Sequence, residues 1–400
     1  MVIARRGSRL MLAAVLASLV PLVGCAKGNE STGTGGTTGT GGSGGVPADD
    51  PFFGLPAAKA LHVQGNKLVD TTGATVRLLG VNRAGSEYMC SPPTVGGTTF
   101  DGSTGPSSIN AMLTWNMNTV RLPLNEHCWL GINGSLIGAE EYRASIVDYV
   151  VRLHQRNLYV VLDLHWSAPG NTVITGGSGG NQLVTMAFAD HAIDFWTSVA
   201  TTFKNDPMVI FDLFNEPILN ANDRFGNGPL ADSAAWACWR NGCSVAKGQV
   251  AGMQQMLTAV RATGAQQVVV AGGIEWSHNM DMWLQFKPDD PTGNLMAAFH
   301  VYQRPLSDCD TEACWNGALA AVASNVPVLT GEMGQQDCGT STFIRQYMTW
   351  ADARGISYLG WAWNPQNCNT FPALISNFDG TPTGFGQYLK DYLATFPALH

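Results

Sequence analysis

Charge is scarce in this 400-residue sequence, since Asp, Glu, Lys and Arg together make up only 13% of it. Basic residues are fewer than acidic ones: there are 22 Lys and Arg against 30 Asp and Glu, which gives a formal net charge of −8. Proteins that bind nucleic acid usually carry a basic surface, so this balance argues against such a partner. Low charge with 12 Trp and 46 Gly suits an extracellular protein that handles a neutral polar ligand.

Three other patterns are missing. No Cys-x-x-Cys or Cys/His spacing indicates zinc. No glycine-rich phosphate turn follows the first predicted strand, which argues against a doubly wound nucleotide-binding sheet. The apolar run at residues 10–23 is too short for a comfortable membrane span.

That apolar run belongs to a targeting segment. Basic residues precede it, and it ends in a Leu-Val-Gly-Cys sequence at Cys25, which looks like a bacterial lipobox. We therefore expect residues 1–25 to be a lipoprotein signal peptide that leaves Cys25 lipidated; the alternative is an ordinary signal peptide with an incidental cysteine. Residues 26–56 are rich in Gly, Thr and Ser and predict a flexible linker. The protein is expected to be exported, and either secreted or held at the cell surface or outer membrane through the lipid alone.

Nine cysteines are present, and the eight beyond Cys25 predict a disulfide framework in an exported chain. Eight cysteines allow 105 connectivities. Short local spacing favours two pairs, and elimination leaves two more. The expected pairs are Cys238–Cys243, Cys309–Cys314, Cys90–Cys128 and Cys338–Cys368.

From residue 57 onward, strand-like and helix-like segments alternate. Residues 61–70 alternate around Gly65-Asn66 and predict a β-hairpin that plugs one end of the domain. Strand-like runs follow at residues 76–82, 119–124, 158–164, 208–214, 267–271, 295–300, 327–331 and 357–363. Helices are expected at residues 106–116, 140–155, 188–203, 248–262, 311–323, 341–353 and 384–395. Eight β/α units predict a (β/α)₈ TIM barrel over residues 57–400. We expect the protein to be a monomer.

One of these runs ends abruptly in Asn215-Glu216-Pro217. Residues 208–214 are apolar on both faces, as in a buried parallel strand, and Pro217 stops the strand because it has no N–H to donate. Glu216 then lies at the carboxyl end of a core strand, where barrels place their chemistry. The structural alternative is a helix start with Asn215 as its N-cap.

A second glutamate, Glu332, ends the seventh run, on the opposite side of the barrel from the fourth. Two facing carboxyl groups about 5–5.5 Å apart are what retaining glycoside hydrolysis needs, one as proton donor and one as nucleophile. Polar and aromatic residues end the other runs too. They are Asn82, Arg121, Asn125, Glu126, His165, Trp166, Glu275, Trp276, His300, Tyr302, Trp363 and Asn364.

The ordered set resembles glycoside hydrolase family 5, the cellulase family within the clan of retaining (β/α)₈ enzymes. The resemblance covers about residues 57–398 and makes residues 57–400 a catalytic domain without metal or cofactor. The matching positions are Arg121, His165, Asn215, Glu216, His300, Tyr302, Glu332 and Trp363.

The resemblance implies a role for each residue. Glu216 would be the acid/base, positioned by His300, and its pKa must be raised for it to stay protonated. Glu332 would be the nucleophile, kept ionised by Arg121 and oriented by Tyr302.

Sugar contacts are implied as well. Asn215 would bond the sugar 2-hydroxyl, His165 would line the subsite of the reacting sugar, and Trp363 would be its aromatic floor. Outer-subsite platforms are expected at Trp129, Trp166 and Trp276, with loop packing as the alternative for each.

The oligo- or polysaccharide substrate stays open, because enzymes for β-1,4-glucan, mannan and xyloglucan share this set. We expect a β-1,4-glucanase, with a β-mannanase or exo-acting β-glycosidase as alternatives, since long loops at residues 85–105 and 218–247 could wall off one end of the cleft. Two other classes are weaker. A non-catalytic sugar-binding lipoprotein would not need both glutamates, and a metal-dependent hydrolase using His165 and His300 lacks the usual His-x-His on the first strand.

Overall fold

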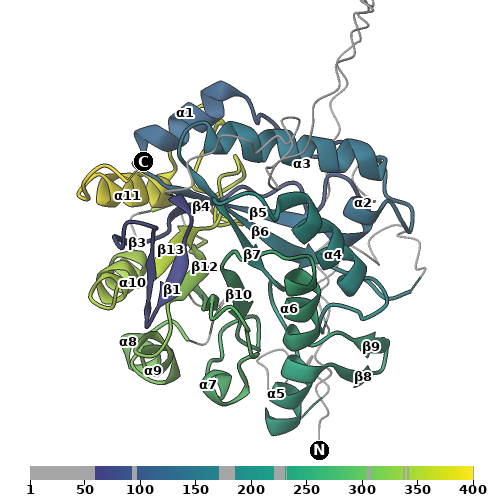
Figure 1. The fold of residues 1–400 in the computed structure, drawn as a ribbon. Coiled ribbons are helices and arrows are strands. Elements are labelled where there is room, and N and C mark those ends of the chain that lie inside the picture. The colour runs from purple at the N-terminus through teal and green to yellow at the C-terminus, as the bar shows by residue number, and fades with distance from the viewer. Residues whose placement is uncertain are drawn as a thin grey trace, which may run out of the picture. The chain divides into compact units, whose positions relative to one another are not determined.

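The computed structural model describes residues 59–91, 97–170, 185–219, 230, 232–303, 307, 309–336, 338–339 and 342–399. The expected signal peptide, lipidated Cys25 and linker lie outside the described residues. Eight parallel strands form a closed barrel, and helices surround it (Figure 1). The (β/α)₈ prediction is confirmed.

Each barrel strand pairs with its sequence neighbours, and the last strand closes onto the first. Nearly every strand residue is buried, because helices cover the outside while side chains fill the inside. This explains why the strands read as continuous apolar runs. They are β4 (Leu79–Asn82), β5 (Thr119–Asn125), β6 (Tyr159–Trp166), β7 (Val209–Asp212), β10 (Val269–Gly272), β11 (Leu295–Tyr302), β12 (Val328–Gly334) and β13 (Ser357–Gly360).

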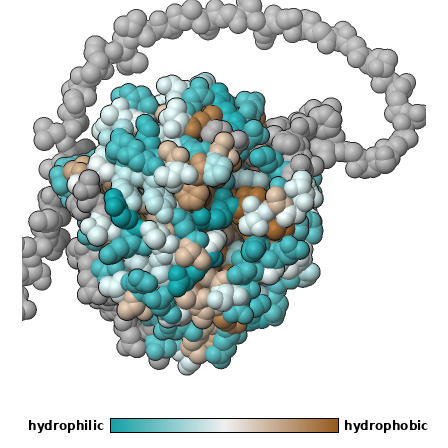
Figure 2. Space-filling view, turned by 90° about the vertical axis from the view of Figure 1, so that its left-hand side faces the viewer, coloured by the Kyte–Doolittle hydropathy of each residue, from teal (hydrophilic) through white to brown (hydrophobic). Residues whose placement is uncertain are grey.

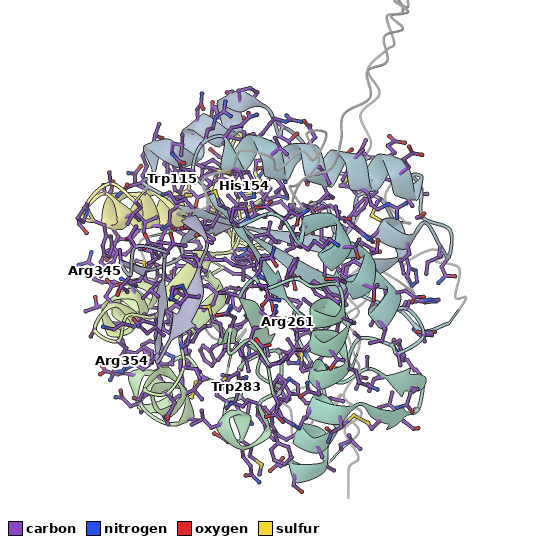
Figure 3. The ribbon with its side chains drawn as sticks, in the orientation of Figure 1. Trp115, His154, Arg261, Trp283, Arg345 and Arg354 are labelled. Atoms are coloured by element: carbon purple, nitrogen blue, oxygen red, sulfur yellow. A yellow bond between two sulfur atoms is a disulfide. The ribbon has the colours of Figure 1, made fainter. Side chains whose placement is uncertain are left out.

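Amphipathic helices form the outer layer. In α3 (Ala139–His154) one face is apolar, and its residues, including Ile146 and Leu153, are buried. Trp115, which follows α1 (Pro106–Thr114), and Trp283 of α7 (Trp283–Phe286) are fully buried, and both are labelled in Figure 3. The other helices are α1 (Pro106–Thr114), α2 (Glu126–Leu130), α4 (Ala192–Phe203), α5 (Asp232–Asn241), α6 (Met253–Ala262), α7 (Trp283–Phe286), α8 (Glu312–Trp315), α9 (Ala318–Ala323), α10 (Thr342–Asp352) and α11 (Gly384–Leu393).

The N-terminal hairpin closes the amino end of the barrel. Its strands β1 (His62–Gln64) and β2 (Lys67–Val69) turn at Gly65, whose φ of 61° suits glycine. Leu68 packs with residues from inside the barrel, as predicted. A third strand, β3 (Thr75–Val76), pairs with β2, so the predicted strand at residues 76–82 is in fact two strands.

Other segments also differ from their predictions. The loop expected around the Cys238–Cys243 pair contains helix α5, and residues 248–250 form strand β9 (Gly248–Val250), paired with β8 (Cys243–Val245), instead of starting a helix. The helix expected at residues 311–323 breaks at Gly317, whose backbone is non-helical. The strand expected at residues 357–363 ends at Gly360, and this early end changes the site.

The described chain contains four disulfides, and they join the pairs expected from spacing and elimination. None of the described helices is long and apolar enough to cross a membrane. On the face shown in Figure 2, small groups of apolar residues lie among polar ones.

Candidate active site

Predicted site residues from five strands meet at the carboxyl end of the barrel. An irregularity in strand pairing positions two of them, His300 and Glu332. The register between β11 and β12 shifts after Phe299, so that His300 lies beside Glu332 and Gly331 is the extra residue. A Cβ at Gly331 would lie 2.9 Å from His300 Nε2, so the close approach of the two strand ends requires glycine.

Glu216 and Glu332 face each other across His300. The Nδ1 atom of His300 lies 2.9 Å from Glu216 Oε1 and 3.7 Å from Glu332 Oε2. One carboxylate oxygen from each glutamate and a ring nitrogen of His300 all lie within 4.8 Å of one another. The two carboxyl groups are therefore at the short spacing of a retaining pair.

Glu332 is held by donors on both oxygens. Arg121 Nη1 donates to Oε1 at 3.0 Å, and the Tyr302 hydroxyl donates to Oε2 at 2.5 Å. Across the described chain, the polar contact recorded for Glu216 is the one with His300. The two carboxyl groups thus lie in different surroundings although they are neighbours.

Arg121 is a fully buried hub beneath the two glutamates. Its Nε lies 3.0 Å from Asp212 Oδ2, and its Nη2 lies 3.0 Å from Asp163 Oδ2. It also donates to Asn82 at 3.0 Å and to Asn215 at 2.8 Å. The sequence prediction omitted both aspartates, although each is a lone acid within an apolar strand.

The charges around Arg121 shift one another's pKa values. Burial raises the pKa of Asp163 and of Asp212 to about 7 each, against the lowering effect of Arg121. Burial alone would lower the pKa of Arg121, but Asp163, Asp212 and Glu332 together raise it. Arg121 therefore stays charged and shares that charge among three carboxyl groups.

The two glutamates titrate as a pair, and their surroundings set the order. Burial raises the pKa of Glu216 well above the usual value, and repulsion from Glu332 raises it further. Burial also raises the pKa of Glu332, but Arg121 and the Tyr302 hydroxyl act against that rise. Glu332 therefore ionises first and Glu216 keeps the remaining proton.

Both site histidines are neutral. Burial lowers the pKa of His165 to about 3 and that of His300 well below its usual value. His165 Nδ1 lies 2.6 Å from Asp163 Oδ2, and its Nε2 lies 3.4 Å from Asn215 Nδ2. His165 therefore donates through Nδ1 and accepts through Nε2, which fixes the orientation of the Asn215 amide.

Trp363 is not the floor of the cleft, so that prediction was wrong. Its side chain is fully buried, donates to Ser108 Oγ at 3.2 Å and packs edge-on against Trp115. Trp361 lies at the cleft instead, with its ring stacked on His165 at 5.3 Å and an angle of 9°. Strand β13 ends at Gly360, so the alternation that would place Trp361 and Trp363 on the same face stops before both residues.

The outer tryptophans divide in the same way. Trp129 is fully buried and donates to Ser198, so it packs in the core and is no platform. Trp166 is half-buried, with its ring centre 6.2 Å from that of His165 and 6.3 Å from that of Tyr88. Trp276 is half-buried after β10, so Trp166 and Trp276 stay candidates for sugar contact.

The two rim carboxylates without an assigned role lie apart from this group. Glu126 is fully buried and accepts from Ser167 Oγ at 2.9 Å, and burial raises its pKa to about 8. Glu275 accepts from Asn279. Arg83, a candidate cation partner for these carboxylates, donates to the carbonyls of Ala84 and Asp101.

A family model for the cellulases, glycosyl hydrolase family 5, matches residues 69–367. The chain belongs to this family. Endoglucanase C of Evansella cellulosilytica is 22% identical over 357 residues, which are 83% of this chain and 39% of that protein. A mannan endo-1,4-beta-mannosidase of Streptomyces lividans is 24% identical over 332 residues, 81% of this chain and 71% of that protein. The chain thus spans less than half the length of the endoglucanase.

Solved structures share the fold. The beta-glucanase SdGluc5_26A of Saccharophagus degradans, in complex with cellotetraose, matches with a TM-score of 0.63 and 19% identity over 85% of this chain and 96% of that chain. The catalytic domain of a mannanase from Streptomyces sp. SirexAA-E matches with a TM-score of 0.57 and 21% identity over 87% and 94%. These likenesses support the family barrel and leave the sugar open.

Proposed function

We propose that this member of family 5 is a retaining β-glycosidase that works by double displacement. Glu216 donates its proton to the glycosidic oxygen while Glu332 attacks the anomeric carbon, so the aglycone leaves and a covalent glycosyl ester forms on Glu332. Glu216, now a carboxylate, takes a proton from water, and that water cleaves the ester with retention of configuration.

The observation that carries this proposal is the unequal environment of two carboxyl groups within 4.8 Å of each other. Arg121 and Tyr302 both donate to Glu332, as a nucleophile requires. Glu216 meets a neutral imidazole instead. With the His300 proton on Nδ1 donated to Glu216 Oε1, the acid proton of Glu216 is on Oε2 and free for the leaving group.

The substrate we propose is a β-1,4-linked glucan. Relatives named endoglucanase support this choice, as does the beta-glucanase that was crystallised with cellotetraose. A β-1,4-mannan is the second candidate, because the Streptomyces lividans relative is named as a mannosidase and is matched over more of its own length.

A panel of soluble β-glucan, mannan, xylan and aryl β-glycosides tests both parts of the proposal. Proton NMR of the first product should show the β-anomer before mutarotation, with the highest kcat/KM on glucan. An α-anomer would overturn the retaining mechanism, whereas β-anomer formed chiefly from mannan would overturn the glucan assignment alone. Product sizes would separate endo from exo action.

We also propose that the protein is exported and lipid-anchored through Cys25 as a monomer. The lipobox-like sequence at Cys25 and the polar linker of residues 26–56 support this proposal. Labelled palmitate should enter the full-length chain but not a Cys25→Ser variant. Equal labelling of both would contradict the anchor, and a mass above that of one chain in light scattering would contradict the monomer.

A further inference from the structure

Three consecutive residues without a glycine among them adopt left-handed backbone angles immediately after β10. The φ values are 54° at Glu275, 61° at Trp276 and 58° at Ser277. Side chains clash with the backbone in this region, so a run of three persists only where its surroundings hold it. An antiparallel bridge between Ile274 and Asn279 closes the turn. We refer to residues 274–279 as the left-handed turn.

The left-handed turn grips the chain on both sides of Glu216. The Ser277 hydroxyl donates at 2.8 Å to the carbonyl of Asn215, which belongs to the peptide unit that leads into Glu216. The Trp276 backbone N–H donates at 3.1 Å to the carbonyl of Pro217, one residue beyond Glu216. The backbone of Glu216 is thus fixed from the neighbouring strand, since β10 pairs directly with β7 (Figure 1).

The same turn also holds the partner of Glu216. The backbone N–H of His300 donates at 2.9 Å to the carbonyl of Ser277. Ser277 therefore forms hydrogen bonds with the backbone next to Glu216 and with the backbone of His300, the two residues that contact each other. Its side chain is fully buried. Glycine at position 272 leaves room for this arrangement, because a Cβ there would lie 2.7 Å from the Ser277 hydroxyl oxygen.

We propose that Ser277 is a positioning residue for the acid/base step, holding Glu216 and His300 in the relation that proton donation needs. This inference rests on the proposed role of Glu216 and goes beyond it by naming the residue that aims the acid. The left-handed angles place the Ser277 hydroxyl and carbonyl toward two different strand ends at once. Proton donation matters little when the leaving group departs readily. Misplacing the acid should therefore lower kcat/KM chiefly for substrates with poor leaving groups.

Ser277→Ala tests the proposal on aryl β-glycosides that span good and poor leaving groups. We expect kcat/KM to fall on the order of 10-fold or more for the poorest leaving group and less than about 3-fold for the best. Ser108→Ala is the matched control, because Ser108 is also buried and loses one hydrogen bond, that from Trp363, outside the cleft. It should lower the melting temperature without any dependence on the leaving group.

Gly272→Ala is a second, independent variant, since its methyl group would push the Ser277 hydroxyl off the Asn215 carbonyl. It should give the same dependence on the leaving group. Glu216→Ala is assayed in parallel to separate the two hypotheses. If Glu216→Ala lowers kcat/KM equally on all substrates, the acid role of Glu216 is contradicted. The positioning role is overturned if Glu216→Ala shows the dependence on the leaving group but Ser277→Ala and Gly272→Ala do not. Those two variants would then either lower kcat/KM equally on all substrates or leave it unchanged, and the proposed function would stand.

Discussion

The hydroxyl of Tyr302 lies 2.5 Å from Oε2 of Glu332, and this hydrogen bond favours the ionised form of the carboxyl group. Tyr302→Phe removes the donor and keeps the ring. Losing one such donor should lower kcat on the order of 100-fold. The pKa of Glu332 should also rise, so the acidic limb of kcat/KM against pH should move to higher pH.

The pH profiles of Tyr302→Phe and the parent chain, measured on one substrate, check this expectation. Tyr347→Phe is a suitable control, because Tyr347 is a buried tyrosine whose hydroxyl bonds Thr330 outside the cleft. An acidic limb that stays in place in Tyr302→Phe would mean that Tyr302 does not set the ionisation of Glu332.

The two neighbouring tryptophans after β13 should have separate effects. Trp361→Ala removes the ring stacked on His165 and should lower kcat/KM on the order of 100-fold. Trp363→Ala should instead destabilise the fold by about 3–5 kcal/mol, because it empties a buried site against Trp115. Kinetics and chemical denaturation of both variants check this, and the opposite pattern would restore Trp363 as the floor.

Glu126 should make stability depend on pH. Its pKa is about 8 in the folded protein and near 4.5 when unfolded, so the folded state binds more protons between these values. The free energy of unfolding should therefore fall as pH rises from about 4.5 to about 8. Glu126→Gln cannot titrate, so its stability relative to the parent chain should rise over this range, by a total on the order of 2–4 kcal/mol.

Thermal melts of the two proteins at pH 5 and pH 8 measure that difference. Glu140→Gln, on the exposed surface of α3, is the control and should shift little between the two values. A Glu126→Gln difference that is constant with pH would show that this carboxyl group titrates normally.

The disulfides should differ in what they contribute to stability. Cys90–Cys128 closes 38 residues, whereas Cys238–Cys243 closes five. The loop-entropy model predicts a cost of about 4 kcal/mol for replacing the first pair with serine and about 2 kcal/mol for the second. Denaturation of the two double variants checks the order, and an equal or reversed cost would contradict the loop-entropy account.

The sequence predicted the barrel because each buried strand is a continuous apolar run, and it predicted most of the site because polar residues end those runs. Trp363 was misplaced because the prediction extended a regular strand through residue 363, whereas β13 ends at Gly360 and alternation stops there. Asp163 and Asp212 were missed because a carboxyl group inside a strand makes sense only once Arg121 is known to lie between them.

The left-handed turn could not have been foreseen at all. Glycine and asparagine are the residues that usually adopt left-handed angles, whereas residues 275–277 are Glu, Trp and Ser. Their conformation comes from contacts with strands that lie far away in sequence, such as the Ser277–Asn215 hydrogen bond. Such contacts cannot be inferred from the local conformational preferences of the residues in the turn.

Covalent trapping tests the central claim, that Glu332 is the nucleophile and Glu216 the acid/base, most directly. A 2-deoxy-2-fluoro glycoside with a good leaving group should form a glycosyl ester that is hydrolysed slowly. Mass spectrometry of the digested protein should then locate one added sugar on Glu332, with no addition in Glu332→Ala. A sugar on Glu216, or on any residue other than Glu332, would contradict the account.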